Sequence, residues 1–94
     1  MASTVRLFQG FEPMDAAELR AGLDGLERLR RAARERESAT VMASFTTAAT
    51  RSLLRHARWI GRRSPRTALA LLGRAAAWRL ERPPPRAAAR EGRA

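Results

Sequence analysis

The sequence predicts an all-α protein: a small three-helix arrangement with an extended N-terminal arm and a basic Pro/Ala/Arg-rich C-terminal tail. Three observations lead to this prediction. A capping box at Asp15 precedes leucines at three- and four-residue spacing, Ser64-Pro65 is typical of a helix start, and the prolines at 83–85 end any helix before them. With 94 residues, the chain is one small domain or a short subunit of a larger assembly.

The N-terminal arm is expected to cover residues 1–14. The segment from Thr4 to Phe11 contains β-forming residues, and Gly10 and Pro13 bound it. It would be a short strand or an extended segment. One strand cannot form a sheet alone, so a strand here would need a partner chain.

Residues 15–82 are expected to form the helical domain, and its first helix covers 15–37. Asp15 and Glu18 have the spacing of a capping box. Gly22 lies within the apolar face and would admit a close neighbour. A coiled-coil seam is the alternative to an ordinary amphipathic helix, although Arg30 falls at a core-like position of that seam. The apolar face consists of Leu19, Leu23, Leu26, Leu29 and Ala33.

The second helix is expected near 44–62 and has two opposite faces. Residues 38–46 contain both strand-forming and helix-forming residues, and we favour a helix that begins between Ser38 and Thr46. One face is formed by Ala49, Leu53, His56 and Ile60, and the opposite face by Arg51, Arg55, Arg58 and Arg62.

The third helix is expected from Pro65 to about Arg82, with a flexible basic tail at 83–94. Its apolar residues occupy two faces, which is typical of a central helix or of one that also contacts a partner. The predicted partner-binding residues are Leu69, Leu71, Trp78 and Leu80.

The positive charge is concentrated in one part of the chain. The net charge is +10, and all 19 basic residues are arginines. Residues 1–37 contain seven arginines and seven acids, whereas residues 38–80 contain eight arginines and no acid. A region of one sign attracts polyanions such as nucleic acid, anionic lipid or an acidic protein face.

The residue types argue against catalysis and against a resident cofactor or metal. The chain has no cysteine and one histidine, and no phosphate-binding glycine loop or hydrolase motif is present. We therefore expect a non-enzymatic protein in which His56 is a core histidine hydrogen-bonded to the backbone. No stretch is long and apolar enough to span a membrane, no secretory signal is visible, and we expect a cytoplasmic location.

The second predicted helix, the connection Gly61-Arg62-Arg63-Ser64 and the third predicted helix resemble part of a helix-turn-helix. Ala57 and Gly61 have the spacing of the alanine and turn glycine in that motif, and the segment 64–67 resembles the start of the recognition helix in LuxR-type and sigma-factor region 4 domains. The resemblance implies that Arg66, Thr67 and Ala70 face a DNA groove. Two arginines between Gly61 and Ser64 depart from the family pattern.

These features predict a small basic protein that binds a polyanion, with DNA or RNA phosphates as the expected partner. The alternative is a structural or adaptor subunit that docks by its apolar helix faces, either to a partner protein or in a homo-oligomer. An amphipathic protein at a membrane surface is a third, less favoured interpretation. The predicted nucleic-acid-binding residues are Arg51, Arg55, Arg58, Trp59, Arg62, Arg63 and Arg66.

Overall fold

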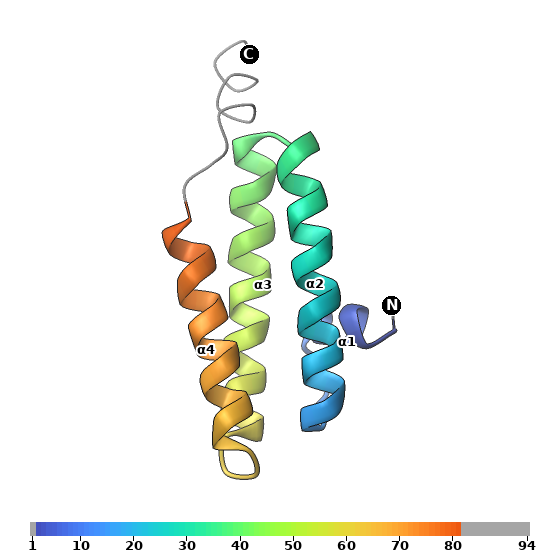
Figure 1. Ribbon diagram of the computed structural model, residues 1–94, viewed down its shortest axis with the longest axis vertical. Coiled ribbons are helices and arrows are strands. Elements are labelled where there is room, and N and C mark those ends of the chain that lie inside the picture. The colour runs from blue at the N-terminus through green and yellow to red at the C-terminus, as the bar shows by residue number, and fades with distance from the viewer. Residues whose placement is uncertain (1, 82–94) are drawn as a thin grey trace.

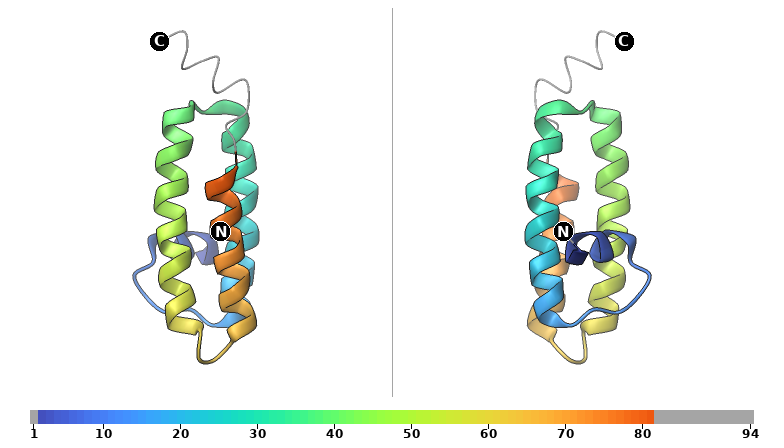
Figure 2. Two further views of the ribbon diagram at one scale, coloured as in Figure 1. Left: turned by 90° about the vertical axis from the view of Figure 1, so that its left-hand side faces the viewer. Right: turned by 90° about the vertical axis from the view of Figure 1, so that its right-hand side faces the viewer.

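The computed structural model describes residues 2–81, and within them every regular element is a helix. Three long helices run side by side and alternate in direction (Figure 1). A short N-terminal helix lies across the α2–α3 pair, on the side opposite α4 (Figure 2). The four helices are α1 (Ala2–Gln9), α2 (Ala16–Arg36), α3 (Ala39–Ile60) and α4 (Pro65–Leu80).

α2 begins at the cap that the sequence predicts, whereas α3 begins at Ala39, before the start that was expected near residue 44. The Asp15 carboxylate accepts a hydrogen bond from the Glu18 backbone N–H at 2.8 Å, and the Ser38 hydroxyl accepts one from Val41 at 3.2 Å. Residues 39–46 are helical, as favoured. Glu18 turns away from the cap and pairs with Arg6 of α1.

α4 begins and ends close to the predicted positions. Pro65 is its first residue and Ser64 precedes it, as expected. The Ser64 hydroxyl forms no hydrogen bond to a backbone N–H and instead contacts the Thr67 hydroxyl at 2.7 Å. The predicted tail at 83–94 lies outside the described residues.

The prediction of an extended N-terminal arm is wrong for residues 2–9, which form α1. Leu7 and Thr4 are one helical turn apart, and both are buried between α1 and its neighbours. A helix satisfies its own backbone hydrogen bonds, whereas a lone strand would leave them without partners. Packing therefore outweighs the local β-propensity of this segment.

Two glycines of α2 let α1 approach closely. A Cβ atom on Gly22 would lie 2.7 Å from the Ser3 carbonyl oxygen, and one on Gly25 would overlap the Thr4 hydroxyl. The close neighbour expected at Gly22 is therefore α1.

The chain leaves α1 through Gly10, whose φ of +65° lies in the left-handed region that favours glycine. Two side chains of α3 hold this end of α1. The Ser52 hydroxyl donates to the Phe8 carbonyl at 2.6 Å, and the Arg55 guanidinium donates to the Gly10 carbonyl at 2.8 Å.

The core is one cluster of buried residues to which all four helices contribute. Leucines from each helix are almost fully buried, and the Phe8 ring stacks on Phe45 with the centroids 5.4 Å apart. The largest buried apolar residues are Leu7, Leu19, Leu26, Leu53, Leu71 and Trp78. Leu29, predicted in the core, is 41% exposed, and Arg30 is buried instead.

Candidate nucleic-acid interface

The arginines of α3 lie on its solvent side, as the helical periodicity predicts. Arg51, Arg55 and Arg58 are exposed, whereas Leu53 and Ile60 on the opposite face are buried. Arg62, Arg63 and Arg66 continue the exposed positive charge through the α3–α4 loop to the first turn of α4. The basic face is defined by six exposed residues: Arg51, Arg55, Arg58, Arg62, Arg63 and Arg66.

Most of the basic face has no ion-pair partner in the part of the chain that the structure describes. Among residues 2–81, Arg51, Arg58, Arg62, Arg63 and Arg66 form no ion pair, because the acidic partners lie on α2 and at Glu81. Arg55 differs, since it hydrogen-bonds the Gly10 carbonyl and so helps to hold α1. Five of the six guanidinium groups therefore carry no ion pair to any described residue.

Trp59 lies beside this face and is 41% exposed. Its ring packs edge-on against the His56 ring, with the centroids 5.2 Å apart. The contact holds one side of the indole while the rest is accessible. This arrangement suits a side chain that lies against a sugar or a base.

The helix-turn-helix resemblance does not extend to the geometry. α3 and α4 run antiparallel beside one another (Figure 1), whereas that motif needs two helices crossing at about 90–120°. Thr67, which the resemblance places against a groove, is 2% exposed. Arg66 and Ala70 are exposed, so α4 presents only two of the three residues that the resemblance places against a DNA groove.

The four predicted partner-binding residues divide into two pairs. Leu71 and Trp78 are 1% and 3% exposed and pack inside the chain's own core. Leu69 and Leu80 are 67% and 83% exposed. Only the second pair is accessible in this fold.

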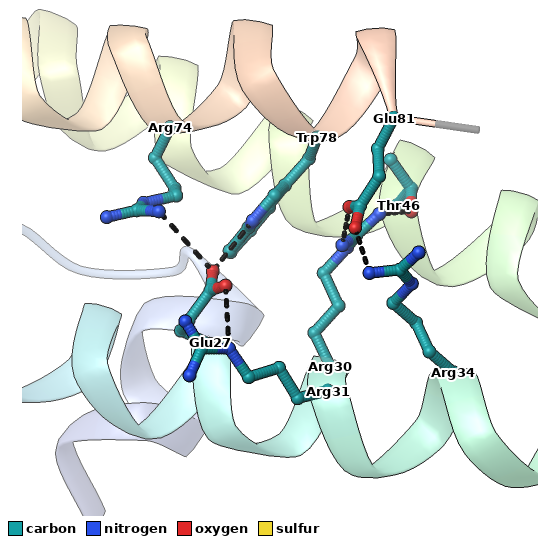
Figure 3. Close-up of polar contacts among 8 residues, drawn as sticks. All are labelled: Glu27, Arg30, Arg31, Arg34, Thr46, Arg74, Trp78 and Glu81. Atoms are coloured by element: carbon teal, nitrogen blue, oxygen red, sulfur yellow. Dashed lines mark hydrogen bonds and ion pairs between the residues drawn. The ribbon is translucent and has the colours of Figure 1, made fainter. Parts of the chain in front are cut away.

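A polar cluster between α2 and α4 was not among the predicted site residues. Glu27 accepts a hydrogen bond from the Trp78 indole N–H at 2.8 Å and lies near Arg31 and Arg74 (Figure 3). Glu81, just beyond α4, pairs with both Arg30 and Arg34 of α2. The core-like heptad position of Arg30 was the sequence signal for this cluster.

His56 is a buried residue at the contact between α1 and α3. Its burial was predicted, but neither ring nitrogen has a hydrogen-bond partner of normal geometry within residues 2–81. Burial is the main cause that lowers the pKa of His56 from 6.5, and the charge of Arg55 lowers it further. The backbone of Leu7 and Arg6 partly opposes this lowering, while the Arg6 charge adds to it.

This lowered pKa predicts a loss of stability in mild acid. Below about pH 6.5 the unfolded chain binds more protons at His56 than the folded chain does. The stabilisation is therefore complete above that pH and is lost as pH falls from 6.5 through the lowered pKa. For one proton, the free energy of unfolding changes by at most about 1.4 kcal/mol per pH unit.

Urea unfolding of the parent and of His56→Gln between about pH 7.5 and about pH 5.5 measures this effect. We expect a smaller pH dependence in the variant, since the carboxylates titrate alike in both proteins. If the free energy of unfolding changes equally with pH in the two proteins, then His56 takes up its proton as readily in the folded chain as in the unfolded chain.

Metal sites and membrane-spanning helices are both absent from the described part of the chain. Residues 2–81 contain no group of three or more His, Cys, Asp or Glu side chains placed to hold a metal ion. Within the same range, no helix has the length and apolar character needed to cross a membrane. Comparison with protein-family models, curated proteins and solved structures finds no match to this chain.

Proposed function

We propose that the protein binds nucleic acid through its basic face, by contacts to phosphates. The observation that carries the proposal is the set of five exposed arginines with no ion-pair partner within residues 2–81. No acid occurs between residues 38 and 80 to neutralise them. Guanidinium groups bind phosphate through two parallel hydrogen bonds, which suits arginine to this role.

The spacing of these arginines makes the charge costly without a partner. Like charges three or four residues apart on a helix repel by a few tenths of a kcal/mol for each pair. The negative end of the α3 dipole offsets this for Arg58, which lies in the last turn, but not for Arg51. A phosphate backbone would offset it along the whole face.

The geometry favours recognition of the backbone over recognition of base sequence. Arg51 and Arg58 are separated by about 10 Å along the helix, given a rise of about 1.5 Å per residue. This length spans several phosphate charges of a duplex. Phosphate contacts fix the position of a protein but carry no base information. We therefore expect binding that depends strongly on salt and weakly on sequence.

The test is a triple variant, Arg51→Gln with Arg58→Gln and Arg62→Gln. It leaves Arg55 in place because that side chain holds the end of α1. Affinity for duplex DNA and for RNA is measured between about 50 mM and about 200 mM salt. We expect the slope of log K against log salt to become shallower by about 0.9 for each duplex phosphate that the variant no longer neutralises. The decrease in affinity should be similar for unrelated sequences.

The matched control removes the same charge elsewhere, with Arg20→Gln, Arg28→Gln and Arg31→Gln on the exposed side of α2. The control should retain more affinity and a steeper salt slope than the α3 variant. Anionic vesicles in the same titration test the membrane-surface interpretation. If the α3 variant binds DNA and RNA as tightly as the parent at low salt, the basic face does not bind nucleic acid.

An apolar stripe on α4 favours a second function, docking as a subunit of an assembly. Leu69, Leu72 and Leu80 are exposed on the outside of this helix. Sedimentation at several concentrations tests whether the stripe joins copies of the chain. A cooperatively unfolding monomer at every concentration would count against a homo-oligomer.

A further inference from the structure

A pocket of about 260 Å³ lies where α2, α3 and α4 come together, at the C-terminal end of α4. Arg30 and Arg34 of α2 line one side, and Trp78, Arg79 and Glu81 line another. α3 contributes a mainly apolar wall with Met42 and Ala43, together with Thr46 and Thr47. None of the residues of the basic face lines this pocket.

The described lining of the pocket has an excess of positive charge. Arg30, Arg34 and Arg79 face a single carboxylate, Glu81. Its two oxygens are divided between Arg30 and Arg34 (Figure 3), and Arg79 forms no ion pair within residues 2–81. Three cations and one anion give a net charge of +2 on the lining residues. This charge matches that of a small dianion.

Arg30 is the unusual member of this group. Its side chain is 6% exposed, and its guanidinium carbon lies 5.2 Å from the centre of the Trp78 ring. One terminal nitrogen donates to the Thr46 hydroxyl at 3.3 Å, and the buried Nε has no hydrogen-bond partner among residues 2–81. Because the Nε is inaccessible to solvent, a ligand in the pocket would contact Arg30 through its terminal nitrogens, which also contact Glu81 and Thr46.

We propose that this pocket binds a phosphate monoester that carries a small apolar or aromatic group. The phosphate oxygens would take hydrogen bonds from Arg30, Arg34 and Arg79, which supply planar donors suited to phosphate. The apolar group would contact Met42 and Ala43. The volume lies just below the range of about 300–1,000 Å³ usual for drug-sized ligands, which limits the ligand to a small one.

Glu81 weakens phosphate binding at this site because its carboxylate already contacts two of the pocket arginines. A phosphate must share or displace the contacts that Glu81 makes to Arg30 and Arg34. Removing this negative charge should therefore strengthen binding. If Glu81 merely supported the fold of the pocket, removing its charge would weaken binding instead.

The experiment uses phenyl phosphate as the probe and the fluorescence of Trp78 as the signal. The chain has two tryptophans, so Trp59→Phe leaves Trp78 as the only indole. In this background we expect a saturable change with one molecule of phenyl phosphate bound per chain. Phenol, which lacks the phosphate, should give no saturable change. Inorganic phosphate, which lacks the ring, should bind more weakly than phenyl phosphate.

Three variants locate the probe in the pocket. Arg79→Gln removes an exposed pocket arginine that makes no ion pair within residues 2–81, so it should weaken binding without disturbing the fold. Arg34→Gln should raise Kd by about tenfold or more, as expected when one charge-assisted hydrogen bond is removed. Glu81→Gln should lower Kd severalfold.

Matched controls separate this site from general charge effects. Arg20→Gln and Asp24→Asn change the charge by the same amounts at exposed positions of α2 outside the pocket, and both should leave Kd unchanged. Arg79→Gln should also leave affinity for duplex DNA close to that of the parent, which separates this proposal from the one for the basic face. The proposal is overturned if the phenyl phosphate signal does not saturate, or if the controls shift Kd as much as the pocket variants do.

Discussion

We expect Leu71→Ala to lower the free energy of unfolding by about 2–5 kcal/mol, whereas Leu69→Ala changes it by about 0.5 kcal/mol or less. Both residues belong to α4 and both were predicted to bind a partner. Leu71 is 1% exposed and lies in the core, so truncation leaves a cavity there. Leu69 is 67% exposed, so its truncation removes little buried surface.

The effect at Leu71 is large because a domain of this size has little stability to lose. Folded domains are stable by roughly 0.05–0.15 kcal/mol per residue, so one core leucine accounts for a substantial share. Urea unfolding followed by circular dichroism measures both variants, and the m-value should stay unchanged if only stability changes.

The comparison of Leu69→Ala with Leu71→Ala also tests whether the exposed side of α4 packs against another chain. If Leu69→Ala were as destabilising as Leu71→Ala, and more so at high protein concentration, α4 would be packed against another chain. That result would favour the adaptor function over the basic face as the main role of the protein.

The starts of α2 and α4 were predictable because their signals are local. The Asp15 cap acts within one turn and is present as predicted, and Ser64-Pro65 begins α4. The two faces of α3 were predictable for a similar reason, since a 3.6-residue period separates Arg51 and Arg58 from Leu53. The exposure of Arg51, Arg55 and Arg58 follows from that period alone.

The faces of α4 were not predictable, because this helix has apolar residues on two sides. Periodicity identifies an apolar face but does not say which of two faces meets the core. Leu71 and Trp78 are buried in the core cluster, and the Trp78 indole N–H donates to Glu27 of α2. Leu69 and Leu80, equally apolar, remain outside.

The interior position of Arg30 depends on residues far away in the sequence. Trp78 and Glu81 approach it from the end of α4, about fifty residues later in the chain. On a helical wheel of α2, Leu29 lies on the apolar face and is expected to be buried in preference to Arg30, yet it is 41% exposed. Only the packing of α4 against α2 decides between them.

The helical state of residues 2–9 also depends on contacts with residues distant in the sequence. It leads to a second prediction of a large change in stability. We expect Gly22→Ala to destabilise the protein by about 1–3 kcal/mol. The new methyl group would lie 2.7 Å from the Ser3 carbonyl oxygen and 3.1 Å from the Leu7 Cβ. Because the closest atom belongs to the backbone of α1, a side-chain rotation cannot relieve the overlap, and α1 must shift.

Gly73→Ala is the matched control, since it makes the same change within a helix. Apart from the backbone of its own helix and its chain neighbours, no atom of residues 2–81 lies within 4 Å of a Cβ at Gly73, so the substitution meets open space. Alanine is favoured over glycine in a helix by about 1 kcal/mol, and this variant should gain up to that amount. The same gain opposes the overlap in Gly22→Ala.

Hydrogen exchange should locate the effect of Gly22→Ala. The amides of α1 should exchange faster than in the parent, because the displaced helix opens more often. The amides in the centres of α3 and α4 should lose protection only by the change in global stability. In Gly73→Ala, protection of α1 should not decrease. If Gly22→Ala is stabilised as much as Gly73→Ala and the exchange of the α1 amides is unchanged, then α1 is not seated on the glycines of α2.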